Sequence, residues 1–213
     1  MLKKQQLFLR LKQDIQAQNW QPGTVLTQLE LAEHYALSRI VVRDVLPILE
    51  HEGWLIRHGK AGYQVPAYSA QEAAELCLLR LQLEPLALRL AATELSFTVL
   101  GQAEDLLASS AKQPNLSLYQ RGELNWQFHR MLYQPCAKPH LLRLLDQLHQ
   151  QVSRYLGYQE INLNYHHTST AEHQQLIKFL RAADIDSACA LLTQHINDAT
   201  ELLINHLNSK KAP

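Results

Sequence analysis

Three histidines and one asparagine in the second half of the chain combine the residue types and spacing of a metal site. His173 and His195 each lie on the apolar stripe of an expected helix, and Asn125 and His129 are one turn apart beside a third apolar stripe. Such stripes face the interior of a helical bundle. Imidazole nitrogens and an amide oxygen that converge from three helices suit a divalent metal such as zinc or nickel. Taken singly, each histidine is more often a hydrogen-bonded core residue.

The chain contains eleven histidines, and most lie in this second half. Several show no comparable pattern and are interpreted as surface or packing residues: His140, His149, His166, His167 and His206.

Arg39 and Arg43 have the spacing of a different kind of site. They fall on the polar side of an expected helix whose apolar side carries Val42, Val45 and Leu46. Two arginines one turn apart near a helix N-terminus can bind guanine edges or phosphates in a DNA major groove. For an isolated helix, two solvated surface arginines would be the simpler interpretation.

The first 66 residues contain the elements that would position these arginines. A first amphipathic helix is expected around Leu7 to Ile15, a short one from the capping box at Thr27 to about Tyr35, and a third from the cap Ser38 to about Glu52. Residues 54–58 and 63–66 then predict a hairpin whose tip, residues 59–62, contains two glycines. Helix, helix, helix and hairpin form a winged helix-turn-helix, whose wing contacts the DNA backbone or minor groove.

The chain after Pro66 predicts an all-α bundle. Ser69 and Glu72 form a capping box, so a helix begins near Ala70. Further helices are expected at residues 98–111, 117–134, 138–157, 169–182 and 185–208. The fold class is therefore mainly α, with a DNA-binding domain at 1–66, a linker at 67–69 and a helical domain at 70–213.

Composition restricts the class of protein. Apolar residues make up 46% and charged residues 19% of the chain, which is typical of globular proteins and argues against disorder. No apolar run is long enough for a membrane span and no signal peptide is recognisable, so a cytoplasmic location is expected.

The three cysteines form no metal-binding or disulfide pattern and are interpreted as small buried residues. The formal net charge is zero, with a slight excess of basic residues before residue 67, so charge alone does not indicate DNA binding.

The first 66 residues resemble the winged-helix domain of GntR-family regulators. The resemblance rests on Pro22 and Gly23, residues 31–33, residues 38–39 and 42–46, and the closing segment 62–65. The DNA contacts that the fold and the resemblance together imply are Ser38, Arg39, Ile40, Arg43, His58, Gly59 and Lys60, and the wing tip resembles that of the FadR branch. The sequence departs from the family at Ala36, Ile40, Val41 and Pro47. Pro47, in the middle of the recognition helix, is expected to bend or locally unwind it.

The second domain resembles the FCD effector domain of the FadR subfamily, on residues 80–84, 90–92, 125–129, 172–173 and His195. In such domains an Asp and three His commonly hold a metal that helps to bind a carboxylate metabolite. Asn125 stands here in place of the Asp, and an amide is a weaker ligand than a carboxylate. Arg80 is predicted to bind the effector carboxylate, with an intramolecular ion pair as the alternative.

The sequence thus predicts a homodimeric transcription regulator that binds palindromic operator DNA in response to a small carboxylate metabolite. Two alternatives remain: a regulator for which the metal itself is the signal, and a metalloenzyme built on the histidine cluster. Against the enzyme, no carboxylate is placed beside the histidines except Glu172, which the helical pattern puts on a neighbouring face.

Overall fold

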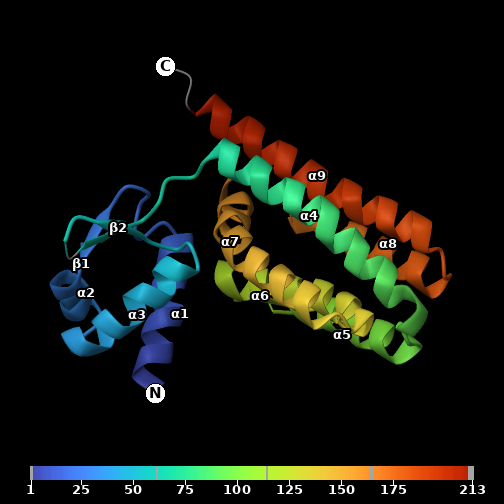
Figure 1. Cartoon of the computed structure of the whole chain (residues 1–213), viewed down its shortest axis with the longest axis horizontal. Coiled ribbons are helices and arrows are strands. Elements are labelled where there is room, and N and C mark those ends of the chain that lie inside the picture. Colours follow the sequence, from blue (N-terminus) through green and yellow to red (C-terminus); the bar gives the residue numbers. More distant parts are fainter. Residues whose placement is uncertain (1, 61, 114, 164–165, 211–213) are drawn as a thin grey trace. The chain divides into compact units, whose positions relative to one another are not determined.

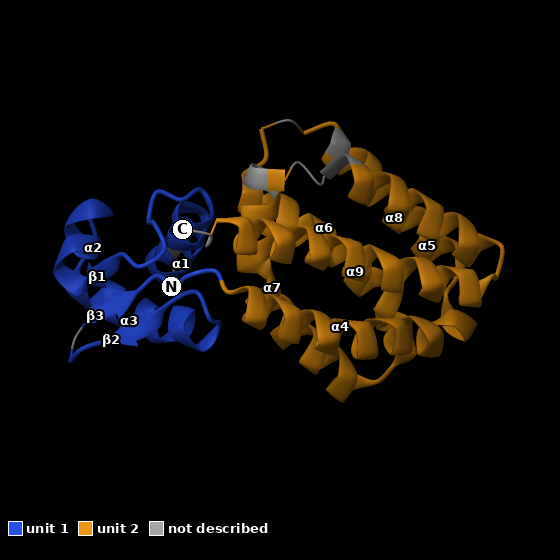
Figure 2. Ribbon diagram, turned by 90° about the horizontal axis from the view of Figure 1, so that it is seen from above, with its two compact units in different colours: residues 1–68 blue, residues 69–213 orange. Residues whose placement is uncertain are grey.

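A computed structural model describes residues 2–60, 62–113, 115–163 and 166–210 of the chain (Figure 1). The chain divides into two compact units, residues 1–68 and residues 69–213 (Figure 2).

The first unit is a winged helix-turn-helix. Its elements in chain order are α1 (Leu2–Gln16), β1 (Val25–Thr27), α2 (Gln28–His34), α3 (Arg39–His51), β2 (Ile56–His58) and β3 (Gly62–Gln64). Leu7, Leu11 and Ile15 on α1 are completely buried, as are Val42 and Leu46 on α3. The predicted helices and the hairpin are therefore confirmed.

The helix starts follow from side chains that cap them. The Thr27 hydroxyl accepts the backbone N–H of Glu30, whose carboxylate accepts the backbone N–H of Thr27 in return. Ser38 caps α3 by accepting the N–H of Val41. Between the two helices Ala36 has φ +53°, the left-handed region that favours glycine. A non-glycine residue thus forms the tight turn that sets α3 against α2.

The wing contains one strand more than the sequence predicts. β3 pairs antiparallel with β2 and also with β1, so the sheet order is β1-β3-β2 and Tyr63 lies between Leu26 and Arg57. β1 has only three residues, too few for a recognisable alternation. Gly59 at the hairpin tip has φ +62°, which a side chain would strain.

Pro47 does not interrupt the recognition helix. α3 is continuous from Arg39 to His51 with Pro47 inside it, so the expected local unwinding is wrong. Proline still lacks the N–H that would bind the Arg43 carbonyl. Pro47 is exposed, so water can satisfy that carbonyl at little cost.

The second unit is a helical bundle. Its longer elements are α4 (Ala70–Ala91), α5 (Phe97–Ala111), α6 (Leu118–Tyr133), α7 (Pro139–Leu163), α8 (His166–Arg181) and α9 (Ile185–Ser209), with short 3-10 turns at Ala92–Glu94 and Gln134–Cys136. The predicted helices are confirmed, although α7 continues six residues beyond the expected end. Ser69 caps α4 as expected, accepting the N–H of Glu72, but the reciprocal bond of the capping box is not formed, because the Ser69 N–H donates to the hydroxyl of Tyr155 and the Glu72 carboxylate pairs with Arg154.

The core of this unit lies between α4, α6, α8 and α9, with Leu88, Phe128, Ile177 and Leu192 at most 1% exposed. Figure 1 shows α4 and α9 running side by side along one flank of the bundle. All three cysteines are buried and unbonded to one another, as the sequence predicts. Among the described residues, no helix is both long and apolar enough to cross a membrane.

Candidate DNA interface and effector site

The face of α3 opposite the core is exposed and cationic. Arg39, Ile40 and Arg43 are all exposed, and Ile40 is 63% exposed although it is apolar. The guanidinium of Arg43 lies 3.8 Å from Asp44, a distance too long for a strong ion pair, and its side chain is 66% exposed. An exposed helix face of this kind, immediately after a helix and a tight turn, has the form of a recognition helix.

The wing tip presents the second set of predicted contacts. His58, Gly59 and Lys60 are exposed at the end of the hairpin. The preceding Arg57, which the sequence analysis did not single out, donates from Nε to both carboxylate oxygens of Glu50, at 3.2 Å each. This ion pair ties the wing to the end of α3, so the two segments that the sequence predicts to contact DNA are connected.

In the second unit a cavity of about 110 Å³ opens among α4 to α9. Its wall includes polar side chains from several helices: Arg80, Arg121, Asn125, Gln159, His173 and His195. The remaining wall is largely apolar, from residues such as Leu106 and Leu156. An apolar cavity with a few convergent polar groups is the usual form of a small-molecule site.

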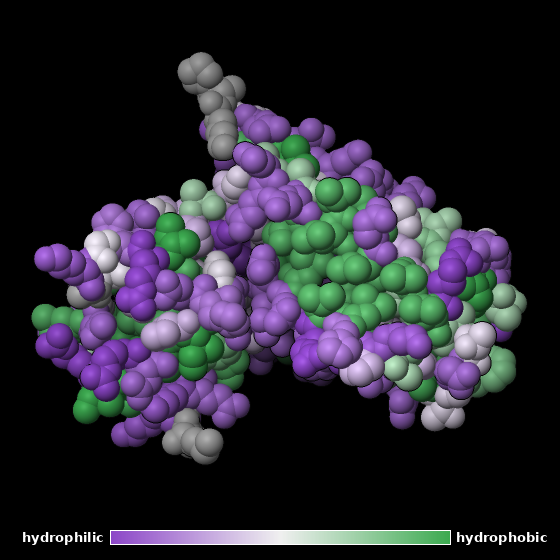
Figure 3. Space-filling model, viewed as in Figure 1, coloured by the Kyte–Doolittle hydropathy of each residue, from purple (hydrophilic) through white to green (hydrophobic). Residues whose placement is uncertain are grey.

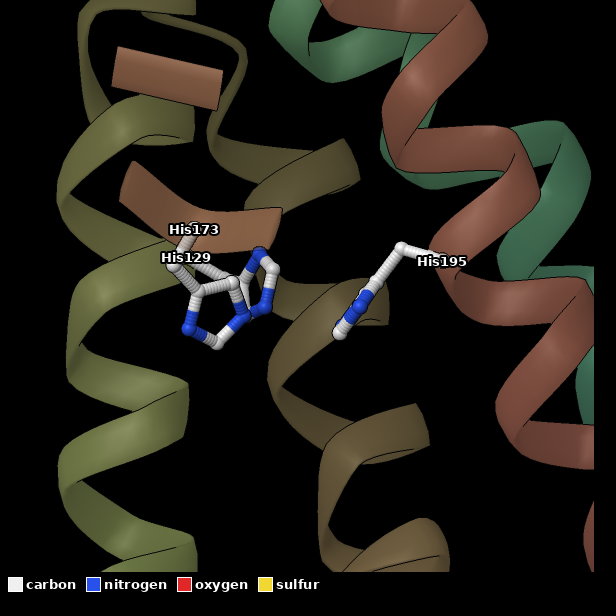
Figure 4. A group of neighbouring side chains, drawn as sticks. All are labelled: His129, His173 and His195. Atoms are coloured by element: carbon white, nitrogen blue, oxygen red, sulfur yellow. The ribbon is translucent and has the colours of Figure 1, made fainter. Parts of the chain in front are cut away.

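Beside this cavity the three histidines come together. His129 on α6, His173 on α8 and His195 on α9 are each at most 7% exposed, and one ligand nitrogen of each lies within 4.8 Å of the others. The ring centroids are 4.8 to 5.6 Å apart. Figure 4 shows the rings directed into the same space between the helices. The inward orientation inferred from the apolar stripes therefore brings all three together.

His129 is held by a chain of hydrogen bonds that the sequence analysis missed. Its Nδ1 lies 3.2 Å from the hydroxyl of Tyr133, which donates to Oε2 of Glu84 at 2.7 Å. Burial, with a smaller contribution from His173 and His195, holds the pKa of His129 well below its usual range. The ring is therefore neutral at pH 7. Within the described part of the chain, its Nε2 is buried and has no hydrogen-bond partner.

His195 has a carboxylate partner. Its Nδ1 lies 2.6 Å from Oε2 of Glu172, which comes from α8. The helical pattern placed Glu172 on a face next to that of His173, and only the packing of α8 against α9 brings it to His195. A carboxylate on the far nitrogen of an imidazole is the common partner of metal-binding histidines.

Asn125 and Arg80 both reach the same region. Asn125 lines the cavity with His173 and His195, and it also borders a smaller enclosed space with His129. Arg80 donates from Nε to Oε1 of Glu84 at 2.5 Å and lines both spaces. The two interpretations of Arg80 are thus compatible, because the side chain forms an intramolecular ion pair and also faces the cavity.

The other histidines do not join this cluster in the described structure. His140 is exposed and His206 half-buried. His149 is buried against Trp126 with ring centroids 4.5 Å apart, and burial lowers its pKa. The side chains of His166 and His167 lie outside the described residues.

Comparison with known proteins decides the family. Residues 3–65 match the family model described as bacterial regulatory proteins of the gntR family, and residues 75–198 match the FCD domain. The chain belongs to the GntR family. This GntR-family protein is therefore a DNA-binding transcription regulator with an FCD domain, and not the metalloenzyme that the histidines left as an alternative.

Similar proteins agree with this assignment along the whole chain. The GntR-family chain is 27% identical over 195 residues to the HTH-type transcriptional repressor GlaR of Escherichia coli, covering 87% of this chain and 89% of that protein. It is 24% identical over 212 residues to the uncharacterized HTH-type transcriptional regulator YdhC of Bacillus subtilis. The match covers 97% of this chain and 93% of that protein. The solved structure of McbR/YncC from E. coli has the same fold as this chain, with a TM-score of 0.75 and 21% identity. The match covers 96% of this chain and 98% of that structure.

Proposed function

We propose that this regulator binds operator DNA through α3 and the wing, and that a small carboxylate metabolite bound in the FCD cavity changes its affinity for that DNA. The observation that carries the proposal is the cavity itself, because it joins Arg80 to the histidine cluster. A guanidinium can bind a carboxylate through two parallel hydrogen bonds.

For the DNA interface we propose two sets of contacts. Arg39 and Arg43 would reach base edges or phosphates in the major groove, with Ser38 and Ile40 beside them on the exposed start of α3. The wing residues His58, Gly59 and Lys60 would contact the backbone or minor groove. Exposure of all seven supports this assignment.

For the cavity we propose a divalent metal, zinc or nickel, held by His129, His173, His195 and Asn125. The fit rests on the buried Nε2 of His129, which has no hydrogen-bond partner among the described residues. The three nitrogens lie within 4.8 Å of one another, and bonds of about 2.0–2.1 Å from each to a shared ion would draw them closer together. Such an ion would supply positive charge beside the cavity. Because an ion bound by three imidazoles and an amide would have no anionic group among these ligands, an anionic effector would complete the site.

We propose further that the regulator is a homodimer and that a second copy covers α4. Figure 3 shows an apolar patch over this helix. Leu78, Leu79, Leu86 and Leu90 on α4 are 40 to 60% exposed. Exposed Glu75 lies near one end of this stripe, and exposed Arg89, which pairs with Asp186, lies near the other, so an antiparallel copy of α4 would bring Glu75 close to Arg89.

The dimer proposal is tested by light scattering after size-exclusion chromatography. Leu79→Lys combined with Leu86→Lys should give monomers, whereas Leu144→Lys, at a leucine 52% exposed on α7, should leave dimers. Dimers in the α4 variant would place the interface elsewhere. A dimer with two winged helices would account for a palindromic operator, and binding to chromosomal DNA implies a cytoplasmic location.

The regulatory proposal is tested with the full chain and DNA selected from a random pool. The affinity for the selected DNA is measured by fluorescence anisotropy with a panel of carboxylates, with zinc or with a chelator. A carboxylate should shift the affinity, and Arg80→Met should abolish that shift while DNA binding remains. A chelator that abolishes DNA binding without any carboxylate would favour the metal itself as the signal. No shift with any carboxylate would overturn the proposed effector class.

The metal is tested separately with Asn125→Asp. Restoring a carboxylate should raise the zinc affinity in the absence of effector. By linkage, a carboxylate effector that binds more tightly with zinc must also tighten zinc binding by the same factor. Elemental analysis that finds no metal in protein equilibrated with zinc or nickel would remove the metal from the proposal.

A further inference from the structure

Glu84 is a buried carboxylate with both oxygens in use. It lies one turn after Arg80 on α4 and is 3% exposed. Oε1 accepts the Nε–H of Arg80 at 2.5 Å, and Oε2 accepts the hydroxyl proton of Tyr133 at 2.7 Å. A buried carboxylate is costly unless it is paired and hydrogen-bonded, and Arg80 and Tyr133 together satisfy that requirement.

The directions of these hydrogen bonds determine a proton position on His129. A tyrosine hydroxyl has one proton, and Tyr133 gives it to Glu84, because a carboxylate paired with arginine can only accept. The oxygen of Tyr133 must therefore accept from Nδ1 of His129, 3.2 Å away. A neutral imidazole carries one N–H, so with the proton on Nδ1 the lone pair is on Nε2.

This tautomer is the one that a metal site at the cluster requires. Nε2 of His129 is the buried atom that has no hydrogen-bond partner among the described residues. A proton on Nε2 would instead prevent this histidine from binding a metal through that nitrogen. The hydrogen bond made by the other ring nitrogen is what commonly selects the tautomer of a metal-binding histidine.

We propose that Glu84 and Tyr133 are positioning residues that hold His129 in the Nδ1–H tautomer and so prepare its Nε2 to bind a metal. The proposal rests on the proposed metal site and adds a relay to it, running from Arg80 through Glu84 and Tyr133 to His129. Arg80 pairs with Glu84, and the same guanidinium lines the cavity. Arg80, the residue proposed to bind the effector, is therefore the first member of the hydrogen-bond relay that fixes the tautomer of His129.

Two substitutions break the relay at different points. In Glu84→Gln one of the two oxygens becomes an NH2 donor, so Arg80 and Tyr133 can no longer each donate to a separate oxygen. With its oxygen toward Arg80, its amide donates to Tyr133, and the tyrosine proton turns to Nδ1 of His129. The proton of His129 then moves to Nε2. Tyr133→Phe removes the acceptor for Nδ1 and the donor to Oε2 of Glu84, and leaves the pair of Arg80 and Glu84.

A matched control comes from the same unit. Glu104 on α5 pairs with Arg181 through two hydrogen bonds of 2.7 and 2.9 Å, and both side chains are partly exposed. Glu104→Gln therefore breaks a second carboxylate–arginine pair of this unit, for which the described structure shows no hydrogen bond to the histidines.

The experiment uses the full chain, first without metal. Nitrogen–proton correlation NMR of the histidine rings reports which nitrogen of His129 carries the proton. We expect Nδ1–H in the unaltered protein and in Glu104→Gln, Nε2–H in Glu84→Gln, and loss of the single Nδ1–H form in Tyr133→Phe. An Nε2–H ring in the unaltered protein, or the same tautomer in all four proteins, would overturn the proposal.

Zinc affinity is then measured by competition with a chromophoric chelator. Glu84→Gln and Tyr133→Phe should each weaken zinc binding by about 10- to 100-fold, the usual effect of losing such a partner, with Glu104→Gln unchanged. Equal affinities in all four proteins would overturn the positioning role. The expected tautomers without zinc binding to any of the proteins would support the tautomer assignment and overturn the proposed metal site, so the two failures are distinguishable.

Discussion

Glu172 and His195 lie 23 positions apart on different helices, yet the carboxylate Oε2 of Glu172 is 2.6 Å from Nδ1 of His195. A carboxylate at this nitrogen favours the proton on Nδ1 and would leave Nε2 of His195 to bind the proposed metal, as Tyr133 would for His129. Two of the three clustered histidines thus have a partner that orients the ring: Tyr133 for His129 and Glu172 for His195. Glu172 lines the same small space as the three histidines.

The first prediction concerns this pair. Glu172→Gln should lower zinc affinity by about tenfold or more, because an amide is a weaker acceptor for the imidazole N–H. The measurement is competition with a chelator. Glu201→Gln is the control, since Glu201 is exposed on α9 and, in the described part of the chain, accepts a hydrogen bond from Asn197 on the same helix. Unchanged affinity in Glu172→Gln would mean that this carboxylate does not support a metal ligand.

The second prediction concerns the recognition helix. Arg43→Ala should weaken binding to the selected DNA by about 1 to 3 kcal/mol, because a base or phosphate contact is lost. Binding is measured by anisotropy at fixed salt concentration, and circular dichroism should show an unchanged fold. Operator affinity equal to that of the unaltered protein would remove Arg43 from the interface.

A third prediction separates the wing from the recognition helix. Lys60→Ala should weaken binding to all sequences alike and flatten the dependence of affinity on salt, because a phosphate contact releases counterions and carries little base information. Affinity is measured between about 50 and 200 mM salt. An altered base preference with an unaltered salt slope would contradict this role.

The fourth prediction follows from the turn between α2 and α3. Ala36→Gly should stabilise the first unit by about 0.5 to 1 kcal/mol, since relief of a left-handed alanine exceeds the added flexibility of glycine in the unfolded chain. Chemical denaturation of the full chain measures the free energy of unfolding. Ala74→Gly, an exposed position within α4, should instead destabilise by about 1 kcal/mol. Loss of stability in Ala36→Gly would show that the turn does not strain alanine.

The fifth prediction is a pH dependence of stability without metal. Burial lowers the pKa of His149 in the folded protein, whereas in the unfolded chain the group titrates near about 6.5. Above that pH the ring is neutral in both states. Below it the unfolded state binds more protons, so the free energy of unfolding falls as pH decreases until the folded pKa is reached.

His149→Phe keeps a ring against Trp126 and should reduce this slope by at most about 1.4 kcal/mol per pH unit. The measurement is denaturation between pH 5 and 8. His140→Phe is the matched control at an exposed histidine and should retain the slope. Equal slopes in the two variants would assign the pH dependence to other groups.

Sequence alone determined the features that depend on residues one or two turns apart. The capping residues Thr27, Ser38 and Ser69 mark helix starts that the structure confirms, because each cap bonds a backbone N–H three residues away. Apolar spacing likewise oriented the three clustered histidines inward, since helical periodicity alone decides which residues share a face.

Tertiary structure decided which side chains meet across elements. β1 is three residues long and becomes a strand only through its pairing with β3. Glu84 and Tyr133 are 49 positions apart, and their hydrogen bond depends on how α4 crosses α6, as the contact of Glu172 with His195 depends on how α8 packs against α9. No local pattern records the rotation and crossing of packed helices, because these arise from the fit of entire helix surfaces. The three histidines were therefore accessible to sequence reasoning, while the partners that orient them were not.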